Sequence, residues 1–196
     1  GKYGLGNAVY PESSRSVENI SAEDYLIKAS KKYRDNLTVI CFGSLTNIAN
    51  AIKKDKKFAK RLKNIIIMGT SYDPDAVHPY LEFNVMANVS AAKLVFDTPF
   101  ENMKVISHEC AIHTVIDKNY IDGLRYSDKL LSNFIYQISE KYMQYNKEHY
   151  NIDGISVPDP LTIASVINPN VVEYEKAKIK IIDEGERKGE SIITLG

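Results

Sequence analysis

The chain has 196 residues, which is enough for one domain with a buried core. Its 25 Lys and Arg residues equal its 25 Asp and Glu residues, so no basic excess predicts a nucleic acid or an anionic membrane surface as a partner. Two cysteines argue against a disulfide framework and favour a reducing, cytoplasmic location. No apolar run approaches the roughly 20 residues that a membrane-spanning helix needs.

The first predicted elements alternate between helix and strand. Residues 1–20 have no apolar period, and Ser21 with Asp24 three positions later predicts the start of a helix. The apolar run at 37–42 predicts a buried strand, and a helix follows it through Ile52.

The pattern continues along the chain. The run at 65–68 predicts a second buried strand, residues 90–96 a helix, and residues 103–106 a third strand. Apolar runs at 179–182 and 191–195, separated by glycine-containing turns, predict a terminal β-hairpin. The alternation predicts an α/β fold with an open, largely parallel sheet flanked by helices.

A polar loop after the second strand contains the first candidate functional residues. Glu82 and Asn84 stand on either side of Phe83, and in an extended segment they would point to one face. A carboxylate beside a carboxamide can bind the neighbouring hydroxyl groups of a sugar. In the alternative interpretation, these side chains hydrogen-bond to their own backbone.

The second half of the chain contains two further patterns. His108, Cys110 and His113 suggest a metal site or a nucleophilic pair, but the spacing typical of zinc ligands is missing. Ser127 is expected to cap a long helix with an apolar stripe that forms a core or an oligomer face. The stripe consists of Leu131, Phe134, Ile135, Ile138, Tyr142 and Tyr145.

Asp159 precedes a proline and opens a short apolar helix, which is ordinary helix-start chemistry. In open α/β sheets, however, ligands bind beyond the carboxyl ends of the strands. If the helix packs at that edge, Asp159 joins Glu82 and Asn84 there. Such an acidic, amide-rich cluster suits a polyol or a hard cation better than a phosphate.

Four segments, in this order, resemble the inosine–uridine nucleoside hydrolase family. They are CFGSLTNIANAI, IIIMGTSY, EFNVMANVSAAKLVF and VPDPLTIA, and the resemblance covers about residues 37–168. It implies an open α/β sheet and calcium-dependent hydrolysis of the N-glycosidic bond of purine and pyrimidine ribonucleosides, giving ribose and free base. It also implies a homodimer or homotetramer that acts on a ribonucleoside.

The resemblance implies roles for five residues. Asp159 would bind calcium and touch the ribose diol, and Phe42 would offer its backbone carbonyl to the ion. Asn84 would bind the 2′- and 3′-hydroxyl side of the ribose and Glu82 its 5′-hydroxyl. Met68 would pack under the sugar.

The chain departs from the family pattern in two ways. The Asp-rich loop that supplies most calcium ligands and the catalytic base is not found; its place would be upstream of Gly1. The chain is therefore expected to be the C-terminal two-thirds of such an enzyme, one domain over residues 1–196 that lacks the first strand and the Asp-rich loop and is inactive alone. The family's histidine and amide positions hold Pro158 and Ala76, which leaves His78 as a candidate acid. A non-catalytic nucleoside- or sugar-binding relative and a purely structural α/β domain stay open as alternatives.

Overall fold

The computed structural model describes residues 4–6, 8, 13–73 and 81–196. The chain divides into two compact units, one of residues 1–18 with 112–157 and one of residues 19–111 with 158–196. The single domain expected over residues 1–196 stays a prediction. His78 and Ala76 lie outside the described residues.

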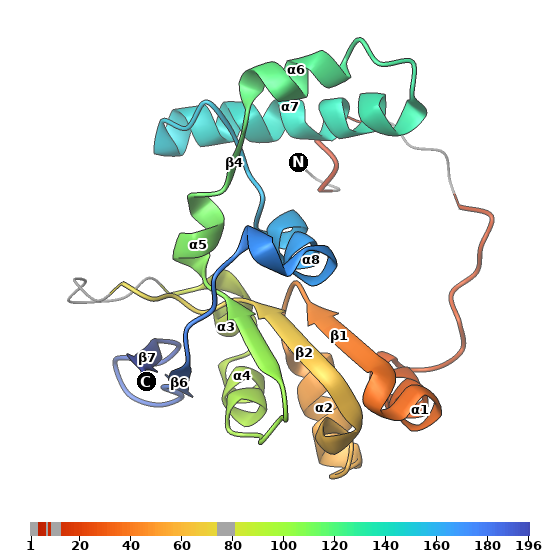
Figure 1. Ribbon diagram of the computed structural model, residues 1–196, viewed down its shortest axis with the longest axis vertical. Coiled ribbons are helices and arrows are strands. Elements are labelled where there is room, and N and C mark those ends of the chain that lie inside the picture. Colours follow the sequence, from red (N-terminus) through yellow and green to blue (C-terminus); the bar gives the residue numbers. More distant parts are fainter. Residues whose placement is uncertain (1–3, 7, 9–12, 74–80) are drawn as a thin grey trace. The chain divides into compact units, whose positions relative to one another are not determined.

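A parallel sheet forms the centre of the larger unit. Its strands are β1 (Leu37–Cys41), β2 (Leu62–Met68) and β3 (Met103–Ile106), in the order β1-β2-β3 (Figure 1). The α/β fold with a largely parallel sheet is therefore confirmed. Strand β2 begins at Leu62, before the predicted residue 65; Leu62 pairs with Leu37, and the register shifts between Leu37 and Thr38.

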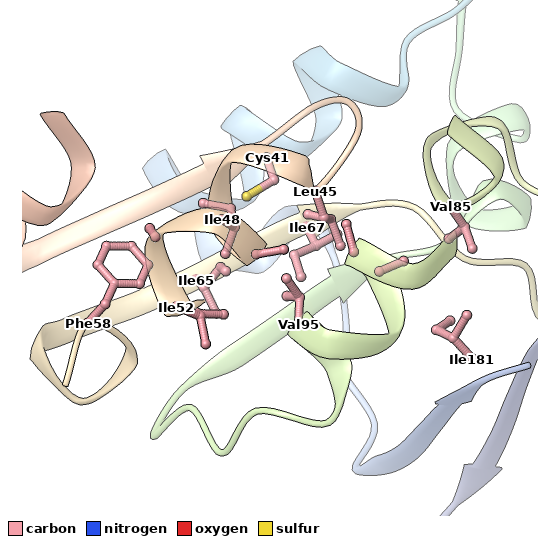
Figure 2. Close-up of a cluster of buried hydrophobic side chains, with 14 of the residues drawn as sticks. Cys41, Leu45, Ile48, Ile52, Phe58, Ile65, Ile67, Val85, Val95 and Ile181 are labelled. Atoms are coloured by element: carbon pink, nitrogen blue, oxygen red, sulfur yellow. The ribbon is translucent and has the colours of Figure 1, made fainter. Parts of the chain in front are cut away.

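Helices cover one face of this sheet and enclose the main apolar core. They are α1 (Ala22–Tyr33), α2 (Thr46–Lys54) and α4 (Val89–Phe96). Figure 2 shows β2 side chains such as Ile65 and Ile67 meeting Ile52 of α2 and Val95 of α4. The predicted cap of the first helix is confirmed, since Ser21 Oγ accepts the Asp24 N–H at 3.2 Å.

Three short helices follow the sheet's carboxyl edge or lie beside it. They are α3 (Phe83–Ala87), α5 (His108–Ile112) and α8 (Pro158–Ile167). Helix α8 contacts β2 and lies beside the arrowheads of β1 and β2 in Figure 1. Short 3-10 helices lie at Arg34–Asn36, Ala59–Arg61 and Pro169–Val171.

The chain ends in the predicted antiparallel hairpin of β6 (Ala177–Ile181) and β7 (Ser191–Leu195). Ile181 is fully buried (0% exposed) and belongs to the same core as the sheet and its helices (Figure 2). The hairpin is thus an integral part of the larger unit.

The smaller unit contains a two-stranded antiparallel sheet and two helices. The strands are β4 (Val115–Asp117) and β5 (Gly154–Ser156), and the helices are α6 (Lys118–Leu124) and α7 (Leu130–Tyr150). The expected cap of α7 is wrong: Lys129 occupies the cap position, and Ser127 Oγ accepts the Lys129 N–H instead. None of the helices in the described part of the chain has the length and apolar composition to cross a membrane.

The apolar stripe predicted on α7 is only partly buried. Leu131 is 66% exposed, and the buried residues of the helix are Ser139, Met143 and Asn146. Met143 packs against Ile155 and Val157 in a small core of its own unit. The oligomer face stays a prediction.

Candidate ligand-binding site

The carboxyl end of β2 brings three of the predicted site residues together. The Asn84 side-chain amide donates to the Met68 carbonyl oxygen at 3.1 Å and lies 3.3 Å from the Met68 sulfur. Gly69 packs so closely on Glu82 that a Cβ added to the glycine would lie 3.2 Å from Glu82 Oε2. Met68, Glu82 and Asn84 therefore form one cluster at the edge where open α/β sheets bind ligands.

Glu82 occupies the N-cap of α3 and Asn84 lies within the helix, so residues 82–84 are not the extended segment in which both side chains would share one face. Its two carboxylate oxygens accept the backbone N–H groups of Asn84 at 2.9 Å and Val85 at 3.0 Å. The side chain is buried, at 3% exposed. A carboxylate here satisfies N–H groups that have no partner within the helix. The alternative interpretation, hydrogen bonding to the local backbone, is thus confirmed for Glu82. Each oxygen still has capacity to accept a further hydrogen bond.

Asp159 lies in the first turn of α8, the helix that contacts β2. Its carboxylate is partly buried and has no hydrogen bond or ion pair with any other described residue. Burial raises the pKa of the Asp159 carboxyl above its usual value. Phe42 directly follows β1, the neighbouring strand, and is 37% exposed. Asp159 thus lies on a helix that contacts β2, and Phe42 lies at the carboxyl end of the neighbouring strand β1, while their role as calcium ligands stays a prediction.

The segment after β2 is held on two sides. Ser191 Oγ accepts the Ser71 N–H at 2.9 Å and donates to the Ser71 carbonyl at 3.0 Å. Glu109 accepts the Ser71 hydroxyl at 2.5 Å and the Tyr72 N–H at 2.7 Å. Burial by itself raises the pKa of the Glu109 carboxyl, but the hydrogen bonds from Ser71 and Tyr72 outweigh it, and the pKa lies below its usual value.

Thr70 is conformationally strained within this segment. Its φ of +72° lies in the left-handed region, which β-branched residues rarely adopt. The side chain is fully buried, and its hydroxyl has no hydrogen-bond partner among the described residues. We expect Thr70→Gly to raise the free energy of unfolding by about 1 kcal/mol, because relief of strain and of the unsatisfied hydroxyl outweighs the lost methyl contact. Calorimetry should show a Tm increase of about 2–4 °C.

Thr162 provides the matched control for this variant. It is equally buried (0% exposed), but its hydroxyl donates to the Pro158 carbonyl at 2.9 Å and its backbone is helical. Thr162→Gly should therefore lower the Tm. A Tm that falls for Thr70→Gly as well would show that the left-handed conformation is not strained in solution.

The suggested nucleophilic pair of Cys110 with a histidine stays a prediction, and one property of Cys110 does not favour it. Burial raises the pKa of the Cys110 thiol, whereas a nucleophilic cysteine needs a lowered pKa. Across the described ranges, no three His, Cys, Asp or Glu side chains are grouped so that they could hold a metal ion.

Sequence reasoning missed Ser71, Glu109 and Ser191. Ser71 and Ser191 are separated by 120 positions, and no motif connects them. Glu109 stands between His108 and Cys110, and no spacing links it to Ser71. The one usable signal was Thr70 directly after a glycine at a strand end, where a tight turn with positive φ is common.

Fold and cluster together define an α/β protein of the type that binds ligands at the carboxyl edge of a parallel sheet. The family model "Inosine-uridine preferring nucleoside hydrolase" matches residues 1–195. The chain belongs to this family, and the resemblance seen in the sequence is confirmed.

Curated relatives and solved structures agree with this assignment. The chain is 28% identical to Uridine nucleosidase 1 of Arabidopsis thaliana over its whole length, and covers 58% of that protein. It is also 28% identical to the inosine-uridine preferring nucleoside hydrolase of Leishmania major, over 92% of the chain and 58% of the relative. The structure of a plant nucleoside hydrolase, PpNRh1, matches with a TM-score of 0.91 at 28% identity, over 99% of this chain and 61% of that one. The chain thus spans less than two thirds of these relatives' length.

Proposed function

We propose that the full-length protein hydrolyses the N-glycosidic bond of purine and pyrimidine ribonucleosides to ribose and free base, by calcium-assisted attack of water on the anomeric carbon. Family membership supports the reaction class. The observation that carries the proposal is the Asp159 carboxylate, partly buried and without a described partner, on a helix that contacts β2. Buried polar groups normally have partners, so such a carboxylate is typical of a ligand site.

The residues present fit a calcium ion in kind. Asp159 offers a carboxylate and Phe42 a backbone carbonyl, and calcium prefers such hard oxygen ligands. Calcium takes about six to eight oxygens, so we propose that water, the ribose and parts of the protein outside this chain supply the others. When bound, the ion would lower the pKa of a ligated water and so favour its deprotonation.

The chain's own residues would bind and stabilise the ribose. Asn84 and Glu82 would hydrogen-bond to its hydroxyl groups, with Met68 packed beneath the ring. The reaction passes through a sugar with oxocarbenium character, whose positive charge carboxylates such as Glu82 and Asp159 stabilise. We assign no general acid, because Pro158 carries no group that transfers a proton. The homodimer or homotetramer remains a prediction.

Ribose release from inosine and uridine by the full-length protein tests this proposal. We expect release in the presence of calcium, a loss of at least about tenfold after chelation, and recovery when calcium is restored. The control substrate 2′-deoxyinosine lacks a hydroxyl that the site is proposed to bind, and should react more slowly. Nucleoside binding without ribose release would favour the non-catalytic alternative.

A further inference from the structure

We propose that Ser191, the first residue of β7, is a positioning residue for the ligand site at the end of β2. It acts through the backbone of Ser71 and touches neither ligand nor reacting atoms. Only the activity measurement below depends on the proposed function, because the hydrogen bonds between Ser191 and Ser71 lie within the protein.

The Ser191 contact is reciprocal and buried. One hydroxyl accepts the Ser71 N–H at 2.9 Å and donates to the Ser71 carbonyl at 3.0 Å. Ser191 is 5% exposed and Ser71 is 1% exposed, so water does not compete for these groups. A single side chain thereby fixes both polar groups of one backbone residue, and an unsatisfied pair would be costly at this depth.

A short path leads from Ser71 to the site. Two positions earlier, Gly69 packs tightly on Glu82, since a Cβ added to the glycine would lie 3.2 Å from Glu82 Oε2. One position before that, the Met68 carbonyl accepts the hydrogen bond from Asn84. A displacement of Ser71 would therefore reach Gly69, which packs on Glu82. It would also reach the Met68 carbonyl, which accepts the hydrogen bond that orients Asn84.

The conformation between these points is imposed by its surroundings. Thr70 has φ +72°, and a β-branched residue stays in that region only when neighbouring contacts over-determine it. The Thr70 carbonyl accepts the His108 N–H at 3.0 Å, and Glu109 holds Ser71 and Tyr72 from α5. Among the described residues, Ser191 supplies the hydrogen bonds from the hairpin to the Ser71 backbone.

Ser30 is a closely matched control for Ser191. It is a fully buried serine (0% exposed) whose hydroxyl donates to the Ile27 carbonyl at 2.8 Å and accepts Arg61 Nε–H at 3.0 Å. Arg61 precedes β2 at its amino end, whereas Ser71 follows β2 at its carboxyl end. Both serines are buried and each hydroxyl donates one hydrogen bond and accepts one, but Ser30 holds a residue before β2 and Ser191 a residue after it.

The experiment compares Ser191→Ala and Ser30→Ala in the full-length protein. Ser191→Ala should lower kcat/KM for inosine by at least about tenfold, because small misplacements of binding groups have large effects on rate. Amide hydrogen exchange should also become about tenfold faster across residues 69–73 and 82–85. Ser30→Ala should lower the Tm to a similar extent and leave kcat/KM and exchange at both segments unchanged.

The inference is overturned if Ser191→Ala lowers only the Tm, as Ser30→Ala does. It is also overturned if exchange quickens at residues 69–73 but not at 82–85. If Ser191→Ala does not fold, Glu109→Gln loosens the same segment through different atoms and the same two readouts apply. A wild-type protein that releases no ribose contradicts the proposed function, and the exchange measurement then decides the positioning role by itself.

Discussion

Replacing Asp159 by asparagine should lower kcat/KM for inosine in the full-length protein by at least about a hundredfold, at a calcium concentration that saturates the wild type. The variant keeps the shape of the side chain and loses its charge. Without the carboxylate, the proposed calcium site loses its only charged ligand from this chain, and the ribose loses a negative group facing its developing positive charge. Ribose release measured over a calcium titration checks the prediction.

The same variant should be more stable than the wild type when calcium is absent. Burial raises the pKa of Asp159 in the folded protein, so the folded state favours the protonated form. The stability linked to this group is therefore fully present below its unfolded pKa of about 3.9 and is lost as pH rises through the folded value. At pH 7 the metal-free wild type carries this cost and Asp159→Asn does not, which predicts a higher Tm for the variant.

Calcium should reverse that order, because an ion that binds only the folded wild type raises its Tm. Asp117→Asn is the matched control, since Asp117 is an N-cap carboxylate of α6 that accepts the Tyr120 N–H at 2.9 Å. It should leave both the calcium response and kcat/KM unchanged. A calcium-dependent Tm increase that survives in Asp159→Asn would remove Asp159 from the proposed ligand set.

Asn84→Ala and Glu82→Gln should each lower kcat by roughly ten- to a hundredfold, at least as much as they raise KM. The proposed hydrogen bonds to ribose strengthen as positive charge grows at the anomeric carbon, so their loss affects the transition state most. Both variants should also lower the Tm, since Asn84 donates to the Met68 carbonyl and Glu82 caps α3. Kinetics and calorimetry on the full-length protein measure the two effects separately.

A helix-capping residue outside the candidate site is a control that shows the effect of losing stability alone. Ser21 caps α1, and Ser21→Ala should lower the free energy of unfolding by about 1 kcal/mol with no change in kcat. If Asn84→Ala and Glu82→Gln behave in the same way, these residues are purely structural, and the ribose would have to be bound by other groups.

The strands of the sheet were predictable because their apolar runs are short and sharply bounded. The run at 103–106 coincides with β3 at both ends. Helix starts were less predictable, since several polar residues near a start compete for the cap. Ser21 is the cap of α1 as predicted, whereas Ser127 lies two residues before Lys129, the cap of α7. Glu82 caps α3 although glutamate is not a preferred cap residue, and spacing alone therefore favoured an extended segment.

The candidate site was predictable only as far as its residues follow strand ends. Met68, Glu82 and Asn84 are close in sequence, and the structure brings them into contact. The support from Ser191 was not predictable, because a contact over 120 positions depends on where the hairpin packs. Periodicity carries information about the face of an element and none about its distant partner.

The packing of the terminal hairpin has a consequence for protein synthesis. A chain leaves the ribosome from its N-terminus, and domains tend to fold in that order. Here Ile181 fills a place in the core built by β2, α2 and α4, and Ser191 completes the hydrogen bonding of the turn after β2. The larger unit therefore reaches its final packing only after the hairpin has been translated, so the nascent α/β layers remain exposed to chaperones and proteases until then.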